Sequence, residues 1–113
     1  MDDCLFCKII AGEIPSAKVY EDECCYAFRD IQPQAPVHVL LVPKAHVANV
    51  VEAASLPDSV LAGLIRAIGI VARQEGIEEG LRVVSNCGPD ACQSVPHLHF
   101  HLLGGRKMAD KMA

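Results

Sequence analysis

The sequence has 113 residues, of which 51% are hydrophobic and 21% charged, with a formal net charge of −4 at pH 7. A chain of this length predicts one domain, residues 1–113, that buries roughly two-thirds of its unfolded surface. Ten basic against fourteen acidic residues argue against broad nucleic-acid binding, which needs a basic face. No apolar run reaches the roughly 18 residues that span a bilayer, so no membrane partner is expected.

The N-terminus and the cysteines indicate a compartment. Met1-Asp2-Asp3 is acidic where a secretory signal is basic, so we expect no signal peptide and a cytoplasmic location. Six cysteines would fit three disulfides in a secreted chain. Without a signal, they are expected to be reduced thiols or metal ligands.

The first predicted elements are a short helical turn at 4–12 and two strands at 17–21 and 24–29. Pro33 and Pro36 bracket a rigid loop. The run at 37–43 is almost continuously apolar and β-branched, which predicts a buried central strand.

A long helix is predicted at 55–74, with Ser55 as N-cap, Pro57 in the first turn and Gly76 as the C-terminal stop. Strands at 81–86 and 95–103 follow. Several strands with one long helix give an α+β domain around an antiparallel sheet. The helix has an apolar stripe formed by Val60, Leu61, Leu64, Ile65, Ile68, Val71 and Ala72.

Three of the five histidines alternate with large apolar residues at positions 97–102, where His97, His99 and His101 are separated by a leucine and a phenylalanine. On a strand, alternate side chains share a face and lie about 6–7 Å apart at the backbone. Because three imidazolium ions this close would repel one another, we expect most of them to be neutral. A neutral imidazole attacks electrophiles or binds metals.

Two functions remain open for these histidines. One is a three-histidine metal site, as in zinc hydrolases. The other is nucleophilic or acid–base catalysis by one imidazole, with its neighbours orienting it and binding substrate charge. The neutral hydrogen-bonding residues Asn86, Gln93 and Ser94 lie just upstream and suit phosphate oxygens, which favours the second interpretation.

Motifs over nearly the whole chain carry a resemblance to a known family. They are residues 6–10 (FCKII) with 13–15 (EIP), 27–31 (AFRDI) with 33–36 (PQAP) and His38, 42–44 (VPK) with His46, and 93–95 (QSV) before the histidine run. With these motifs the chain resembles the histidine triad (HIT) family, and most closely its histidine triad nucleotide-binding branch of small purine nucleoside phosphoramidases.

The resemblance implies that His99 is the nucleophile. It would attack the α-phosphorus of a nucleoside 5′-phosphoramidate and form a nucleotidyl-histidine that water hydrolyses, with no cofactor needed for catalysis. A backbone carbonyl near His97 would hold its other ring nitrogen. The implied catalytic residues are His99, His101, His38, Asn86 and Ser94. The implied nucleotide-binding residues are Phe6, Ile9, Phe28, Asp30, Ile31, Asn86, Gln93, Ser94, His99 and His101, with Asp30 on the ribose and the apolar four around the purine.

A second set of residues, Cys4, Cys7, His46 and His97, has the donor types of a tetrahedral structural zinc site. Some bacterial members of the family carry zinc on this pattern, so the resemblance implies a structural zinc. His97 would then serve the metal and leave His99 and His101 for the chemistry.

The resemblance also implies a homodimer in which two five-stranded sheets form one sheet of ten strands.

Two departures from the family concern specificity. Ala91 and Cys92 stand where many relatives have two glycines, which makes any positive φ there costlier. The C-terminal segment 107–113 lacks the Trp-Pro-Pro ending of animal relatives. Two alternative functions stay open: a purine-nucleotide-binding regulatory module with little catalysis, and a zinc-dependent hydrolase using the three histidines.

Overall fold

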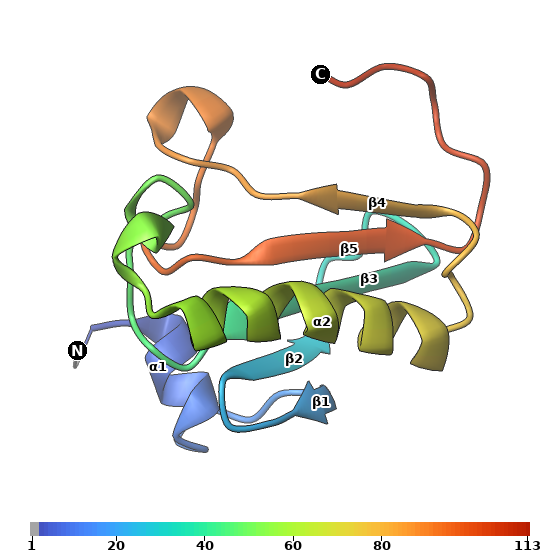
Figure 1. Ribbon diagram of the computed structural model, residues 1–113. Coiled ribbons are helices and arrows are strands. Elements are labelled where there is room, and N and C mark those ends of the chain that lie inside the picture. The colour runs from blue at the N-terminus through green and yellow to red at the C-terminus, as the bar shows by residue number, and fades with distance from the viewer. Residues whose placement is uncertain (1–2) are drawn as a thin grey trace.

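The computed structural model describes residues 3–113 and contains a five-stranded sheet in the order β1-β2-β3-β5-β4 (Figure 1). Every neighbouring pair of strands is antiparallel. Within this range, no helix combines the length and the apolar character needed to cross a membrane. The elements are α1 (Leu5–Ile10), β1 (Lys18–Glu21), β2 (Cys25–Arg29), β3 (Val37–Pro43), the 3₁₀ turn η1 (Glu52–Ser55), α2 (Asp58–Gln74), β4 (Leu81–Val84), the 3₁₀ turn η2 (Pro89–Ala91) and β5 (Phe100–Gly104).

The two faces of the sheet have separate apolar cores because side chains alternate along each strand. On the central strand β3, Val39 and Leu41 belong to the core beneath α2. Leu40 and Val42 belong to the core beneath α1. His38 has the same parity as Leu40, and His101 pairs directly with Leu40 across β3 and β5. Both histidines therefore lie on the α1 face.

The predicted α+β fold with one long and one short helix is confirmed, and α2 packs on β2 and β3. The helix begins at Asp58, so the prediction that Ser55 is its N-cap is wrong. Ser55 lies in η1, where its Oγ donates to the Glu52 carbonyl. Pro57 is extended, with ψ 150°, and its carbonyl accepts the first helical N–H groups, from Val60 and Leu61.

The predicted fifth strand at 95–103 is also corrected, because β5 begins only at Phe100. Pro96 has no N–H for a strand ladder, and the His97 N–H turns back to the Val95 carbonyl at 2.9 Å. His97 and His99 therefore precede the strand. The alternation of faces persists, since Leu98 and Leu102 are buried under α2.

The other boundaries move by fewer residues. The strand expected at 81–86 ends at Val84, so Asn86 lies in the loop beyond it. Ser85, the first residue after the strand, donates from its Oγ to the His99 carbonyl at 2.8 Å. The short helix is Leu5–Ile10, within the expected 4–12. β1 and β2 each begin one residue later than expected.

Candidate active site and metal centre

His99 is buried, at 3% exposed, and one hydrogen bond fixes its ring. Its Nδ1 lies 2.7 Å from the His97 carbonyl oxygen, so Nδ1 carries the proton and donates. This is the backbone carbonyl that the resemblance implied. The opposite nitrogen, Nε2, then holds a lone pair and makes no hydrogen bond to another described residue. Because no buried side-chain nitrogen in residues 3–113 lacks a partner, Nε2 is open to solvent.

His38 and His101 lie beside His99 and contact each other. His38 Nε2 is 2.9 Å from His101 Nδ1 and 3.4 Å from Asp30 Oδ2. Burial lowers the pKa of His38. Burial, followed by the neighbouring His99 and His38, lowers the pKa of His101 to about 4. Both imidazoles are therefore neutral at pH 7, as expected from the crowding of the histidines.

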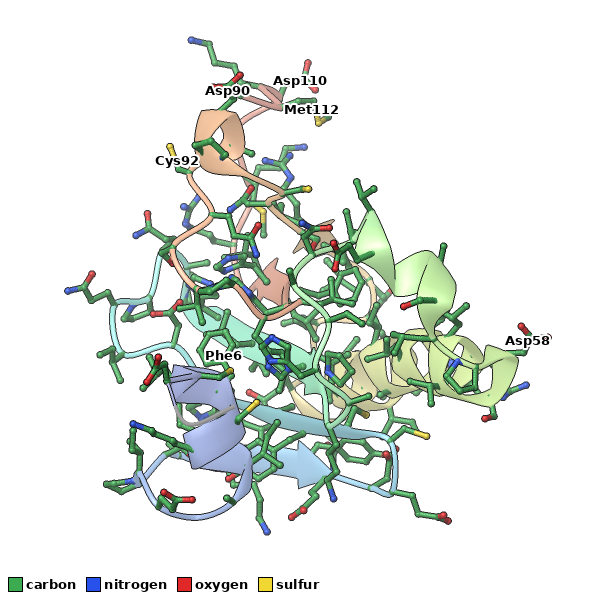
Figure 2. All side chains as sticks on the ribbon, turned by 90° about the vertical axis from the view of Figure 1, so that its left-hand side faces the viewer. Phe6, Asp58, Asp90, Cys92, Asp110 and Met112 are labelled. Atoms are coloured by element: carbon green, nitrogen blue, oxygen red, sulfur yellow. The ribbon has the colours of Figure 1, made fainter. Side chains whose placement is uncertain are left out.

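An apolar pocket of about 430 Å³ opens between α1 and β2, next to the histidines. Phe6, which Figure 2 labels on α1, joins the two regions. It lines the pocket and meets the His99 ring edge-on, with ring centroids 5.1 Å apart. Asp30 also lines the pocket and contacts His38. Ile31 is 95% exposed at the pocket rim. The full lining is Leu5, Phe6, Ile9, Ile14, Pro15, Ser16, Ala17, Phe28, Arg29, Asp30, Ile31 and Leu40.

All five pocket residues named from the resemblance, Phe6, Ile9, Phe28, Asp30 and Ile31, line this pocket. The sequence did not single out several others, among them Ser16 and Leu40. These are ordinary strand and loop residues, and nothing in their local pattern distinguishes a pocket wall from a core contact.

The loop between β4 and β5 contains the residues predicted to donate hydrogen bonds to phosphate, Asn86, Gln93 and Ser94. They differ in whether their side chains are already hydrogen-bonded within the protein. The Gln93 side chain is already hydrogen-bonded to the protein: its Nε2 donates to the Val95 carbonyl in the same loop and to the Ala48 carbonyl in the segment after β3, and its Oε1 accepts the Gly88 N–H. Asn86 and Ser94 make no side-chain hydrogen bond to another described residue, which leaves their polar groups available. In this structure Gln93 therefore orders the loop.

Cys92 in this loop adopts a left-handed backbone, with φ 61° and ψ 38°. It is the one non-glycine residue with positive φ in the described part of the chain. The cost anticipated for replacing a family glycine therefore applies at Cys92. Figure 2 shows Cys92 and Asp90 at the outer tip of the loop, away from Phe6.

Cys4, Cys7, His46 and His97 converge on one point, with their ligand atoms all within 4.8 Å of one another. The Nδ1 atoms of His46 and His97 are 3.1 Å apart, and Cys4 Sγ is 3.2 Å from His97 Nδ1. In tetrahedral zinc sites, with bonds of about 2.0–2.3 Å, ligand atoms lie about 3.3–3.8 Å apart. The donor set and its spacing therefore fit zinc.

Two further features of this cluster concern metal binding: a hydrogen bond of His97 and the pKa of Cys7. His97 Nε2 donates to the Pro43 carbonyl at 2.9 Å, which leaves Nδ1 as the lone-pair nitrogen facing the thiols. Burial and the neighbouring Cys4 raise the pKa of Cys7 to about 11, so a metal would displace a thiol proton on binding. All six cysteines are free thiols.

The alternative of one metal held by His97, His99 and His101 is wrong for this arrangement. Within residues 3–113, those three imidazoles do not form a converging group. His97 turns its Nδ1 towards the two cysteines, and His99 uses its Nδ1 on the His97 carbonyl. The bend before β5 separates His97 from the other two.

The fold and the site together define a small α+β protein whose neutral histidine cluster adjoins an apolar pocket and a Cys₂His₂ cluster. The HIT domain family model matches residues 11–108, and the chain belongs to this family.

Individual relatives agree with this assignment. A HIT family hydrolase from Clostridium thermocellum is 47% identical, with a TM-score of 0.90 over 100% of this chain and 99% of the other. The 14 kDa zinc-binding protein of Brassica juncea is 50% identical over 108 residues, which cover 94% of this chain and 96% of the relative. Adenylylsulfatase HINT1 of Arabidopsis thaliana is 49% identical over 106 residues, 92% of this chain and 72% of the relative.

Proposed function

We propose that this protein is a purine nucleotide hydrolase that acts at the α-phosphate, with nucleoside 5′-phosphoramidates as its substrate class. The observation that carries the proposal is the His99 Nδ1–H bond to the His97 carbonyl at 2.7 Å. It leaves a neutral, solvent-open Nε2 lone pair beside a pocket of about 430 Å³. The hydrolase and adenylylsulfatase names of two relatives support the same reaction class.

The reaction proceeds in two displacements at phosphorus. His99 Nε2 attacks the α-phosphorus and the P–N bond breaks. The leaving nitrogen accepts a hydrogen bond from His101 Nε2–H and takes its proton from a water molecule, so that neutral amine and hydroxide are formed. The intermediate is a nucleotidyl-histidine whose positive ring is stabilised by the His97 carbonyl. The hydroxide then attacks the phosphorus, the bond between phosphorus and His99 Nε2 breaks, and nucleoside monophosphate and free, neutral His99 are released.

The other site residues bind the substrate. The purine enters the apolar pocket, whose wall includes Phe6 and Phe28. The Asp30 carboxylate accepts from the ribose hydroxyls, since Oδ1 already holds only the Gln32 N–H and a carboxylate oxygen accepts two bonds. Asn86 and Ser94 donate to the phosphate oxygens.

Zinc, when bound, would supply a structural cross-link and no catalytic step. Cys4 and Cys7 sit at the start of α1, and His46 and His97 lie in the loops that flank the sheet. The zinc-binding name of the Brassica relative supports this assignment.

The test is to mix the protein with adenosine 5′-phosphoramidate, quench it rapidly and locate the adduct by mass spectrometry. We expect an adenylyl group on His99. His99→Ala should lower turnover on the order of 10³-fold or more. Purine-nucleotide binding should persist, because Asp30 and the pocket remain. An adduct on another residue, or near-normal turnover by the variant, contradicts the proposal. Nucleotide binding without turnover by the native protein would favour the regulatory module.

A further inference from the structure

The proton positions on His38 and His101 are set from outside the histidine cluster. The Gln34 backbone N–H lies 2.9 Å from His38 Nδ1. A backbone N–H can only donate, so His38 Nδ1 must hold its lone pair towards Gln34. Neutral His38 therefore carries its single proton on Nε2. Asp30 Oδ2, 3.4 Å from that Nε2, favours the same proton position.

The second imidazole follows from the first. His38 Nε2–H faces His101 Nδ1 at 2.9 Å, so Nδ1 accepts and neutral His101 carries its proton on Nε2. This Nε2–H makes no hydrogen bond to another described residue. Every fully buried side-chain nitrogen in residues 3–113 has a hydrogen-bond partner, so the unpaired His101 Nε2 is not fully buried. It is open to solvent on the face of the sheet that carries the pocket.

We propose that the Gln34 backbone amide is the tautomer-setting group of the site, which makes His101 Nε2 a hydrogen-bond donor towards the substrate. The effect on the leaving group rests on the proposed function, whereas the proton positions do not. Without this amide, His38 could hold its proton on Nδ1, and His101 Nε2 would then become an acceptor facing substrate oxygens.

The end of β5 holds the Gln34 loop in place. Arg106 Nη2 donates to the Gln34 carbonyl at 3.3 Å. Gly105, at φ 97°, approaches Pro36 so closely that a Cβ on it would come 2.9 Å from the proline Cβ. Arg106 is therefore a positioning residue that acts through the backbone of Gln34, by holding its carbonyl and with it the orientation of the residue that carries the N–H.

The same tautomers exclude a second metal ion. Asp30, His38 and His101 have ligand atoms within 4.8 Å of one another and could hold a cation. A metal there needs lone pairs on both His38 Nε2 and His101 Nδ1. His38 would then carry its proton on Nδ1, directed at the Gln34 N–H, so two donors would collide. The amide thus directs zinc to the Cys4 cluster only.

The direct test is ¹⁵N NMR of the histidine rings in the zinc-loaded protein at pH 7.5. We expect His38 and His101 both as the Nε2–H form, and His99 as the Nδ1–H form. A spectrum with the His101 proton on Nδ1 overturns the inference, whether or not the protein turns over phosphoramidates. Loss of turnover with the expected spectrum counts against the proposed function instead.

A matched pair of variants isolates the amide. Gln34→Pro removes the N–H, whereas Gln34→Ala changes the side chain and keeps it. We expect the proline variant alone to change the His38 and His101 ring signals, to lower kcat about 10²–10⁴-fold with little change in KM, and to take up a second zinc ion. Equal behaviour of the two variants overturns the inference.

The milder variant Arg106→Ala covers the case in which the proline variant does not fold. It keeps the amide but loses its anchor, so we expect partial mixing of the two tautomers in the same NMR experiment. Arg106→Lys should restore the native ring signals, because a lysine can also donate to the Gln34 carbonyl. Native ring signals in Arg106→Ala would remove Arg106 from the positioning role.

Discussion

His97 shows how one residue connects two neighbouring sites. Its Nδ1 faces Cys4 at 3.2 Å, its Nε2–H donates to Pro43, and its carbonyl accepts from His99 Nδ1. The His97 side chain is part of the Cys₂His₂ cluster, and its backbone carbonyl holds the candidate nucleophile His99. A metal at the cluster would therefore also restrain the carbonyl that sets the His99 tautomer.

Asp30→Ala tests ribose recognition at the level of one side chain. A hydrogen bond to a charged group typically contributes about 1.5–3 kcal/mol, which corresponds to roughly 10–150-fold in affinity. We expect adenosine monophosphate to bind weaker by a factor in this range, and the preference over its 2′,3′-dideoxy analogue to disappear in calorimetric titrations. Asp110→Ala, the same change in the C-terminal tail, should leave both unchanged. A preserved preference in Asp30→Ala would exclude the ribose role.

Cys92→Gly tests the cost of the left-handed backbone in the loop. An L-residue at φ 61° costs roughly 1–2 kcal/mol, and glycine removes that cost while adding some unfolded-state entropy. We expect the free energy of unfolding to rise by about 1 kcal/mol in urea titrations. Ala91→Gly, one residue earlier in η2 where φ is negative, should lower it. A loss of stability in Cys92→Gly would contradict the argument.

At the scale of elements, the sequence predicted all five strands and both helices. An alternating or helical run of apolar residues can bury its apolar side in only one type of secondary structure. The predicted starts of two elements were wrong, because backbone hydrogen bonding at prolines decides where these elements begin. Pro96 delays β5 until Phe100, and the Pro57 carbonyl starts α2 three residues after Ser55. The Gln34 amide had no sequence signal at all, since every residue except proline carries the same N–H.

Cys4→Ser separates two functions of the residue that begins α1. Helix α1 has only six residues and is too short to be stable alone. Cys4 caps it, with Sγ accepting the Cys7 N–H at 3.2 Å, and serine is an equally suitable cap. The change therefore removes mainly the sulfur donor.

We expect Cys4→Ser to lower the zinc content below one per chain by elemental analysis, together with Tm. Turnover should fall too, because Phe6 and the His97 carbonyl lose their restraint. Cys92→Ser, an exposed cysteine outside the cluster, is the matched control and should keep native zinc content. Native zinc content and Tm in Cys4→Ser would exclude the metal site.

The buried neutral histidines give the whole molecule a predictable response to acid. The folded pKa of His101, about 4, lies below its ordinary value of 6.5. The unfolded chain therefore binds the extra proton between these values, and the contribution is complete above pH 6.5 and is lost as pH falls towards 4. One proton corresponds to at most about 1.4 kcal/mol per pH unit.

We expect the free energy of unfolding to fall between pH 6.5 and 4, and less steeply in His101→Gln, in urea titrations across this range. Protonation of the Cys₂His₂ cluster contributes equally to the native protein and to His101→Gln. The difference between their slopes of unfolding free energy against pH therefore reports the protonation of His101. Equal slopes would show that His101 does not take up a proton on unfolding.

The two edges of the sheet differ in a way that predicts the assembly. β1 exposes the ion-paired Lys18 and Glu21, which suit an unpaired edge. β4, at the other edge, exposes Val83 at 41%, and α2 lies mainly over β2 and β3 (Figure 1). We propose that two copies pair through β4, which gives a symmetric ten-stranded sheet.

Sedimentation at micromolar concentration should therefore report twice the 12.1 kDa chain mass. Val83→Lys should shift the protein to a monomer, because an edge lysine places its charge where the partner strand would pack. Val50→Lys is the matched control, since Val50 is also 41% exposed but lies outside the sheet, and it should remain dimeric. A native protein that sediments as a monomer would contradict the pairing. Dissociation of both variants would place the contact elsewhere than on β4.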